Sequence, residues 1–336
     1  MPRKVGESEC RTMTPLAPAK SSRLRRGRAA WVLIAASIFM WPLPGLRFAR
    51  AAAAPANMVP RIGSRIAGRE FDYTVAPGQT IQSISARYGV EPRVLASENG
   101  LSSDVRVKPG RVLHIDNRHL VPADINDGIL INVPQKMLFF FCSGALKAAY
   151  PVALGRPTWP TPRGGFQVLE LREHPVWRVP VSIQHEMAMQ GKVVKTVVPP
   201  GPDNPLGDYW IGLSIPAIGI HSTSAPLSIY GFRTHGCIRL HPDDAEALFD
   251  EVAIGQPGQI VYEPVLLGKL DDGRIFLEVH RDVYRKGSSD LEDLQAIAYS
   301  HNLENLINWS LSAEVVRKAD GIARDVTLAP AATPTP

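Results

Sequence analysis

A cysteine and three histidines fall close together between residues 219 and 241 of this 336-residue chain. A cysteine attacks an acyl carbon only as the thiolate, so it needs a neighbouring base or a positive field. His221 precedes Cys237 by sixteen residues, a spacing that suits two adjacent strands. We expect a hairpin-like return to bring the imidazole within hydrogen-bonding reach of the sulfur and to lower the pKa of the thiol. The stretch therefore predicts an active site for acyl transfer.

Two neighbours of Cys237 suit the same chemistry. Gly236 allows a tight backbone, so the amides around Cys237 can point at one spot where an oxyanion forms. Arg239 lies on the same side of an extended segment as Cys237 and offers parallel N–H donors to a substrate carboxylate. We expect these residues to bind what Cys237 attacks.

Spacing alone leaves two other interpretations open. A buried cysteine is usually an inert small hydrophobe, so Cys237 and its histidines have a purely structural alternative. Zinc accepts cysteine and histidine ligands, which makes His221, His235, Cys237 and His241 a second candidate set. Against zinc, the segment has no short Cys-x-x-Cys or His-x-x-x-His pair, and Arg239 places a positive charge beside the metal.

The run from His221 to Thr234-His235-Gly236-Cys237-Ile238-Arg239 resembles the signature of the L,D-transpeptidases of the YkuD type. The resemblance implies that Cys237 is the nucleophile and that His221 accepts and donates the proton. It also implies that His235 and Gly236 shape the oxyanion site, and that the backbone carbonyl of Ser222 orients the base. It implies no metal and no organic cofactor, and it adds that carbapenems acylate the same sulfur.

The same resemblance implies a mainly β catalytic domain over residues 120–264, a sandwich or barrel with short helices and a lid insertion within 173–197. Short apolar runs divided by Gly and Pro support this fold class, and no ten-residue helices alternate with them as in a parallel βαβ sheet. A helix is predicted from Pro242 to Val252. The strand candidates are residues 129–133, 137–141, 148–154, 165–169, 209–213 and 218–220.

A small unit over residues 71–118 precedes this domain. Strands are predicted at 73–75 and 112–115, with helices at 79–88 and 91–98 between them. Its motifs, Tyr-Thr-Val-x-Pro-Gly-Gln-Thr-Ile among them, resemble a LysM domain, which implies binding to the N-acetylglucosamine backbone of peptidoglycan. A packing domain without ligand is the alternative.

Residues 1–54 are predicted to be a leader with an export signal. Arg23–Arg28 is basic, the apolar run Ala29–Trp41 is short for a spanning helix, and Pro and Gly follow it. We expect cleavage near Ala51 and a periplasmic or cell-envelope location. An uncleaved inner-membrane anchor and a start at Met13 are alternatives.

The net charge of +5 is concentrated in this leader, which holds ten of the 37 Lys and Arg and two of the 32 Asp and Glu. The remaining chain has 27 basic and 30 acidic residues, so no basic footprint for nucleic acid is expected.

The other segments are predicted to be accessory. Residues 55–70 are read as a linker, with order beginning at Phe71. Residues 265–328 form an accessory α/β segment with a strand at 275–280 and helices at 289–299 and 312–318, and residues 329–336 form a disordered tail. Three cysteines do not make a disulfide framework, and we expect Cys142 to be a buried strand residue.

The expected function is therefore that of an exported peptidoglycan L,D-transpeptidase. Its partners are peptidoglycan stem peptides at the catalytic domain and glycan at the LysM domain, with a wall lipoprotein as a candidate acceptor. Two alternatives remain: a hydrolytic cysteine peptidase or carboxypeptidase on the same stems, and a non-catalytic LysM wall-binding protein.

Overall fold

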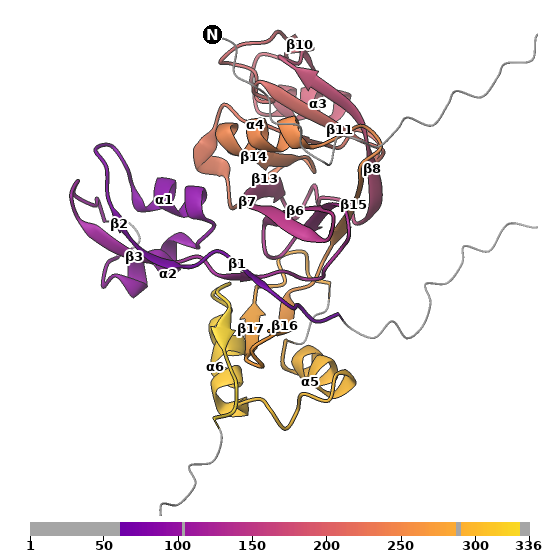
Figure 1. Ribbon diagram of the computed structural model, residues 1–336. Helices are drawn as coiled ribbons and strands as arrows, with labels where there is room; N and C mark the ends of the chain where they lie inside the picture. The colour runs from indigo at the N-terminus through magenta and orange to yellow at the C-terminus, as the bar shows by residue number, and fades with distance from the viewer. Residues whose placement is uncertain (1–60, 103–104, 287–289, 330–336) are drawn as a thin grey trace, which may run out of the picture. The chain divides into compact units, whose positions relative to one another are not determined.

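The computed structural model describes residues 61–102, 105–286 and 290–329 (Figure 1). The predicted leader and all but the first residue of the predicted tail lie outside these ranges. Within the described ranges, no helix combines the length and the apolar character needed to cross a membrane.

A βααβ unit comes first, as the sequence predicts. Its elements are β2 (Glu70–Thr74), α1 (Ile81–Tyr88), α2 (Pro92–Glu98) and β3 (Val112–Asp116), and β2 pairs antiparallel with β3. Thr80 and Ser83 form a capping box at the start of α1, and Gly89 ends the helix at φ 73°. The unit has a core of its own, made by Val75, Ile81, Ile84, Val90, Leu95, Ala96, Val107, Leu113 and Ile115.

The catalytic region is a nine-stranded curled sheet (Figure 1). The strand order is β13-β7-β14-β12-β11-β8-β15-β5-β6, and an additional pairing of β6 with β7 closes the sheet on itself. The closure depends on β7, which pairs with β6 over residues 145–151 and with β14 over residues 152–153. The strands are β5 (Gly128–Asn132), β6 (Met137–Cys142), β7 (Ala145–Gly155), β8 (Gly164–Glu173), β11 (Tyr209–Leu213), β12 (Gly219–His221), β13 (Phe232–Thr234), β14 (Ile238–Leu240) and β15 (Pro257–Val261).

The mainly β fold class and all six strand candidates are thereby confirmed. The sequence missed β13, β14 and β15, because the first two are only three residues long and β15 contains Pro257 and Gly258. Cys142 is buried in β6, and Cys237 is a free cysteine, so the two are not joined.

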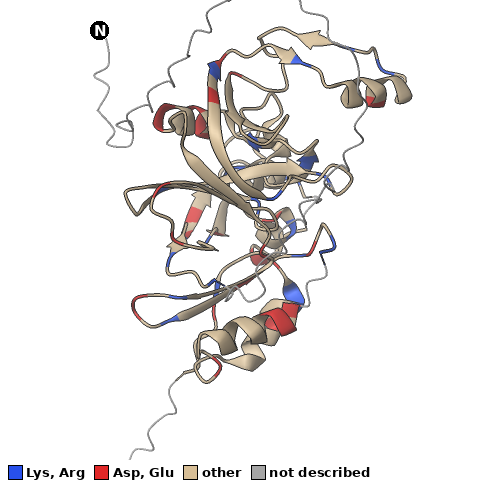
Figure 2. Ribbon diagram, turned by 90° about the vertical axis from the view of Figure 1, so that its right-hand side faces the viewer, with Lys and Arg blue, Asp and Glu red and all other residues tan. Residues whose placement is uncertain are grey.

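One helix packs on this sheet and follows the nucleophile segment. The predicted helix is α4 (Pro242–Glu251), and its apolar residues Ala245 and Leu248 join the core that lies inside the sheet. Figure 2 shows basic and acidic residues interspersed along the ribbon.

A lid segment lies between β8 and β11. It consists of β9 (Trp177–Arg178), α3 (Val181–Met189) and β10 (Val197–Val198), and β9 pairs antiparallel with β10. No residue of α3 is buried, which explains why its sequence shows no apolar face.

The C-terminal segment forms a three-stranded sheet with two helices. The sheet has the order β16-β17-β18, and the predicted strand and helices correspond to β17, α5 and α6. The bounds are β16 (Val265–Lys269), β17 (Ile275–Val279), α5 (Asp290–Ser300), α6 (Trp309–Lys318) and β18 (Arg324–Asp325).

The prediction that order begins at Phe71 is wrong. β1 (Ile66–Ala67) pairs antiparallel with β4 (His119–Leu120), and Gly63 bridges Gly268. These contacts are backbone pairings with distant partners, which leave no hydrophobic periodicity in the local sequence.

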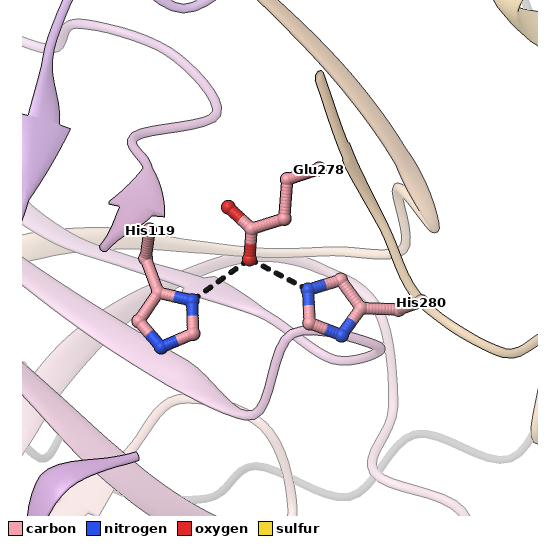
Figure 3. A group of neighbouring side chains, drawn as sticks. All are labelled: His119, Glu278 and His280. Atoms are coloured by element: carbon pink, nitrogen blue, oxygen red, sulfur yellow. Dashed lines mark hydrogen bonds and ion pairs between the residues drawn. The ribbon is translucent and has the colours of Figure 1, made fainter. Parts of the chain in front are cut away.

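A buried carboxylate joins β4 to β17 (Figure 3). Glu278 Oε1 lies 2.8 Å from His119 Nδ1 and 2.7 Å from His280 Nε2. His119 Nε2 lies 2.9 Å from the carbonyl oxygen of Gly89. Both nitrogens of His119 thus face acceptors, the carboxylate of Glu278 and the carbonyl oxygen of Gly89, so the ring links β4 and β17 to the end of α1.

The ionised state of Glu278 follows from these partners. Burial by itself raises the pKa of Glu278, but the charge and hydrogen bond of His119, together with His280, outweigh it and hold the pKa at about 2. Burial also lowers the pKa of His280, which therefore donates as a neutral ring.

Candidate active site

His221 and Cys237 are brought together by two adjacent strands, as the spacing predicts. The strands β12 and β14 pair in parallel, with Ile220 opposite Ile238 and His221 opposite Arg239. The expected hairpin-like return is therefore wrong. The connection crosses over through the 3-10 helix η2 (Pro226–Ser228) and through β13, which pairs in parallel with β7.

Both reactive side chains line one cavity of about 670 Å³, here called the active-site cavity. The lid covers part of it, since Trp177, Arg178, Ile183, Glu186 and Met187 also line it. This arrangement places Cys237, His221 and the lid residues on the walls of the same cavity.

His221 is fixed as a neutral base. Its Nδ1 atom donates to the carbonyl oxygen of Ser222 at 2.6 Å, which assigns the ring proton to Nδ1 and leaves a lone pair on Nε2. The ring is buried and stacks on Trp210, with the ring centroids 5.9 Å apart. Burial and, secondly, the charge of Arg239 lower the pKa of His221 to about 3.

Cys237 is a thiol in this environment. Burial raises the pKa of Cys237, although a backbone hydrogen bond from Gly219 and the charge of Arg239 act in the opposite direction. The expectation of a lowered thiol pKa is therefore corrected. The two reactive groups rest as a neutral thiol and a neutral imidazole, and proton transfer must accompany attack on the substrate.

The sulfur also faces a strained residue that the sequence did not reveal. Cys237 Sγ lies 3.6 Å from the carbonyl oxygen of Ala217, and Ala217 has a φ of 61°. A non-glycine residue in the left-handed region is strained by about 1 kcal/mol or more. The backbone at Ala217 is thus held in an unfavourable conformation beside the nucleophile.

The turn before Cys237 requires glycine and is fastened by Thr234. Gly236 has a φ of 107°, and a Cβ there would lie 3.0 Å from the side chain of Ile218. The Gly236 amide donates to Thr234 Oγ1 at 3.1 Å, and that hydroxyl donates to the carbonyl oxygen of Cys237 at 2.6 Å. The Gly236 amide is therefore engaged, which leaves the Cys237 amide as the candidate oxyanion donor of this turn.

His235 faces the lid. Its Nε2 atom lies 2.5 Å from Glu186 Oε2 and 2.7 Å from Arg156 Nη2, and its ring meets Trp159 edge-on. Arg156 and Glu186 are residues of the site that sequence reasoning missed. Arg156 follows the predicted strand at 148–154 by two residues, whereas Glu186 had no local signal.

Arg239 lines the active-site cavity as expected. Its Nε atom is buried and has no hydrogen-bond partner within the described ranges, and burial lowers its pKa. Ser222 is buried and acts through its backbone, because its carbonyl accepts from His221 and its side chain packs against Gly207.

The zinc set of four residues does not assemble. His221, His235 and Cys237 line the active-site cavity, whereas His241 is not among its lining residues and its Nδ1 lies 3.6 Å from Asp243. The ligand atoms that do gather within the described part of the chain are those of His119, Glu278 and His280.

Family models match both halves of this architecture. The model described as the L,D-transpeptidase catalytic domain matches residues 126–261, and the LysM domain model matches residues 73–116.

Curated relatives extend the match over most of the chain. A probable L,D-transpeptidase, ErfK/SrfK, of Salmonella typhimurium is 32% identical over 241 residues, covering 68% of this chain and 74% of that protein. A probable L,D-transpeptidase, YbiS, of Escherichia coli K12 is 30% identical over 238 residues, covering 69% of this chain and 77% of that protein. Among solved structures, L,D-transpeptidase 3 from Mycobacterium tuberculosis matches with 17% identity and a TM-score of 0.33, over 61% of this chain and 98% of that chain. That likeness is too distant to bear on the chemistry. By its identity to these curated relatives and its matched domains, the chain belongs to the L,D-transpeptidase family and carries a LysM domain before the catalytic domain.

Proposed function

We propose that this enzyme is an exported transpeptidase that acts on peptidoglycan stem peptides through Cys237. The observation that carries the proposal is the placement of a free thiol and a neutral, oriented imidazole in one cavity whose basic residues include Arg239. Arg239 is proposed to bind a stem carboxylate, since its half-buried guanidinium lines the cavity and has no carboxylate partner within the described ranges, Ser228 Oγ lying 3.5 Å from Nη1.

The acylation step uses both reactive groups. As Sγ of Cys237 attacks the carbonyl carbon of the third stem residue, its proton passes to Nε2 of His221. The carbonyl oxygen gains negative charge and is held by amides near Cys237. When the intermediate collapses, the bond to the terminal D-alanine breaks, and His221 returns the proton to the leaving amine.

The second step reverses the proton flow. An amine of a second stem, or of a wall lipoprotein, attacks the thioester and gives its proton to His221. The C–S bond then breaks, and the sulfur recovers that proton. The protein supplies every group that these two steps need.

The position of the enzyme follows from its substrate. The LysM domain is proposed to hold peptidoglycan glycan, which keeps the catalytic domain close to stem peptides at the cell envelope. Export by the N-terminal leader is part of the same proposal.

Mass spectrometry of wall fragments incubated with the protein tests this function. We expect release of D-alanine and formation of linked stems with the natural protein, and neither product with Cys237→Ser, because a hydroxyl beside this imidazole is a much poorer nucleophile. Shortened stems without linkage would instead establish the hydrolytic peptidase. Unchanged products with Cys237→Ser would remove Cys237 from the mechanism, and no product with either protein would favour a wall-binding role.

A further inference from the structure

A carboxylate of the protein itself occupies the space beside His235. The Oε1 and Oε2 atoms of Glu186 lie 2.7 and 2.6 Å from Nη2 of Arg156, and Oε2 lies 2.5 Å from Nε2 of His235. Hydrogen bonds between ionised groups at this length belong to the strong class. Arg156 first and His235 second hold the pKa of Glu186 at about 2, so the carboxylate is ionised at neutral pH.

Two donors share this anion. Arg156 Nη2 lies 2.7 Å from His235 Nε2, and a guanidinium nitrogen only donates. The contact with Glu186 makes His235 Nε2 a donor too. Two N–H groups therefore lie side by side and share one acceptor. A carboxylate accepts from both with charge-assisted hydrogen bonds, so an anion is the preferred occupant of this position while Nε2 of His235 carries the proton.

The donors are fixed, whereas the acid is movable. Arg156 follows β7, and its amide donates to the carbonyl oxygen of Thr234 at 3.0 Å within the barrel. Glu186 lies on α3, a helix without a buried residue, where Met189 is 90% exposed. Elements with few buried apolar contacts open at low free-energy cost. Glu186 can leave while the donors stay.

The charge of the active-site cavity favours an anionic ligand. The basic side chains that line it are Arg156, Arg172, Arg178, Lys192 and Arg239, and the acidic ones are Glu170 and Glu186. Glu170 pairs with Arg172, and Glu186 pairs with Arg156. The excess of basic groups raises the local concentration of ligands that carry several carboxylates.

We propose that Arg156 and His235 form a carboxylate subsite, and that Glu186 is an internal stand-in for a substrate carboxylate. Glu186 fills the subsite in the unliganded protein and leaves it when a peptide carboxylate enters beneath α3. The exchange replaces one set of charge-assisted hydrogen bonds by another and changes no covalent bond. This proposal rests on the proposed function, because stem peptides supply the free carboxylates. Arg156 is then a specificity-determining residue, and Glu186 competes with the substrate.

Calorimetric titration of the Cys237→Ala protein, which cannot turn over, tests this competition. The ligands are a synthetic stem tetrapeptide with free carboxylates and the same peptide with carboxamides in their place. Because Glu186→Gln removes the charge that competes for Arg156 and His235, adding it is expected to strengthen binding of the free-acid peptide about tenfold. Binding of the amide peptide is expected to stay unchanged.

A matched control separates this competition from a general change of charge. Glu170→Gln removes the other acid of the cavity but leaves Glu186 on Arg156, and we expect it to change free-acid binding less than about twofold. Arg156→Gln is expected to weaken free-acid binding about tenfold, and Glu186→Gln to add nothing in that background. Thermal unfolding of each variant establishes that the fold is retained.

Two results overturn the proposal in different ways. If Glu186→Gln weakens both peptides alike, Glu186 merely clamps the lid, while the stem-peptide function stands. If neither peptide binds to any variant, the stem-peptide function itself fails and the subsite assignment fails with it.

Discussion

The Nδ1 atom of His221 donates a hydrogen bond of 2.6 Å to the carbonyl oxygen of Ser222, the next residue in the chain. This contact determines the direction of proton transfer, because it leaves only Nε2 free to accept a proton. A backbone carbonyl performs this task in place of a carboxylate, so the site has an oriented base without a buried acid beside it. The base consequently stays neutral, and its lowered pKa follows from burial and from the charge of Arg239.

We predict that loss of His221 removes the proton acceptor for acylation. His221→Ala is expected to slow acylation of Cys237 by a carbapenem by about 10²- to 10⁴-fold, the usual contribution of a general base. Stopped-flow absorbance at neutral pH measures this rate. His241→Ala is the control, because His241 faces Asp243 outside the site and should leave the rate unchanged. Equal rates for the natural protein and His221→Ala would make His235 the leading base.

The pH dependence of alkylation should report the raised pKa of Cys237. A thiol with a raised pKa loses its thiolate as pH falls below that value, so alkylation by iodoacetamide is expected to be half-maximal above pH 9.0, the ordinary thiol value. Arg239→Gln should move the midpoint higher still, because the charge of Arg239 favours the thiolate. Arg178→Gln serves as the control, being another cation of the cavity. A midpoint well below the ordinary thiol value would show that Cys237 rests as a thiolate at neutral pH.

Thr234 is predicted to hold the nucleophile turn through its hydroxyl. Thr234→Val keeps the shape but removes the hydrogen bonds to the Gly236 amide and the Cys237 carbonyl, each contributing about 1 kcal/mol. We expect carbapenem acylation to slow about tenfold or more, while Thr234→Ser, which keeps the hydroxyl, stays close to the natural rate. Equal rates for the Val and Ser variants would show that the hydroxyl does not position the turn.

Glu278 should stabilise the fold in a defined pH range. Its pKa is lowered from an ordinary 4.5 to about 2. The contribution of Glu278 to the free energy of unfolding is therefore complete above about pH 4.5 and is lost as pH falls towards 2. Glu278→Gln leaves His119 without its anionic partner and is expected to cost about 3 kcal/mol at pH 7. Urea unfolding measures this difference, which should shrink on acidification. Asp272→Asn, which changes an exposed acid paired with Arg274, should leave the free energy of unfolding close to that of the natural protein.

The βααβ unit is predicted to bind the wall without the catalytic domain. Residues 71–118 bury a core of their own, and we expect this fragment to sediment with insoluble peptidoglycan. Here Gln79 stands in a motif position where LysM domains usually have aspartate, and its side chain accepts from Tyr73 Oη at 2.8 Å and from the Ala76 amide at 2.9 Å. A fragment that stays in the supernatant across pH and salt would exclude this wall-binding role.

The sequence by itself determined the elements whose signals are local. Apolar runs predicted the longer strands, the apolar face of α1 and the proline of α4 predicted helices, and the segment from His221 to Arg239 identified the reactive groups. Such features depend on a few neighbouring residues, since side-chain periodicity and capping act within one or two turns.

Only the tertiary structure decided how these groups interact. Strand direction between β12 and β14 depends on the whole connection, so the parallel pairing was not evident from the spacing. The raised pKa of Cys237 depends on burial by distant segments, and the sequence carries no local signal for it. The contact of Glu186 with Arg156 joins two residues that are thirty positions apart, one on an exposed helix and one just after β7. Long-range packing and desolvation therefore set the chemistry, while local sequence supplied the residues that perform it.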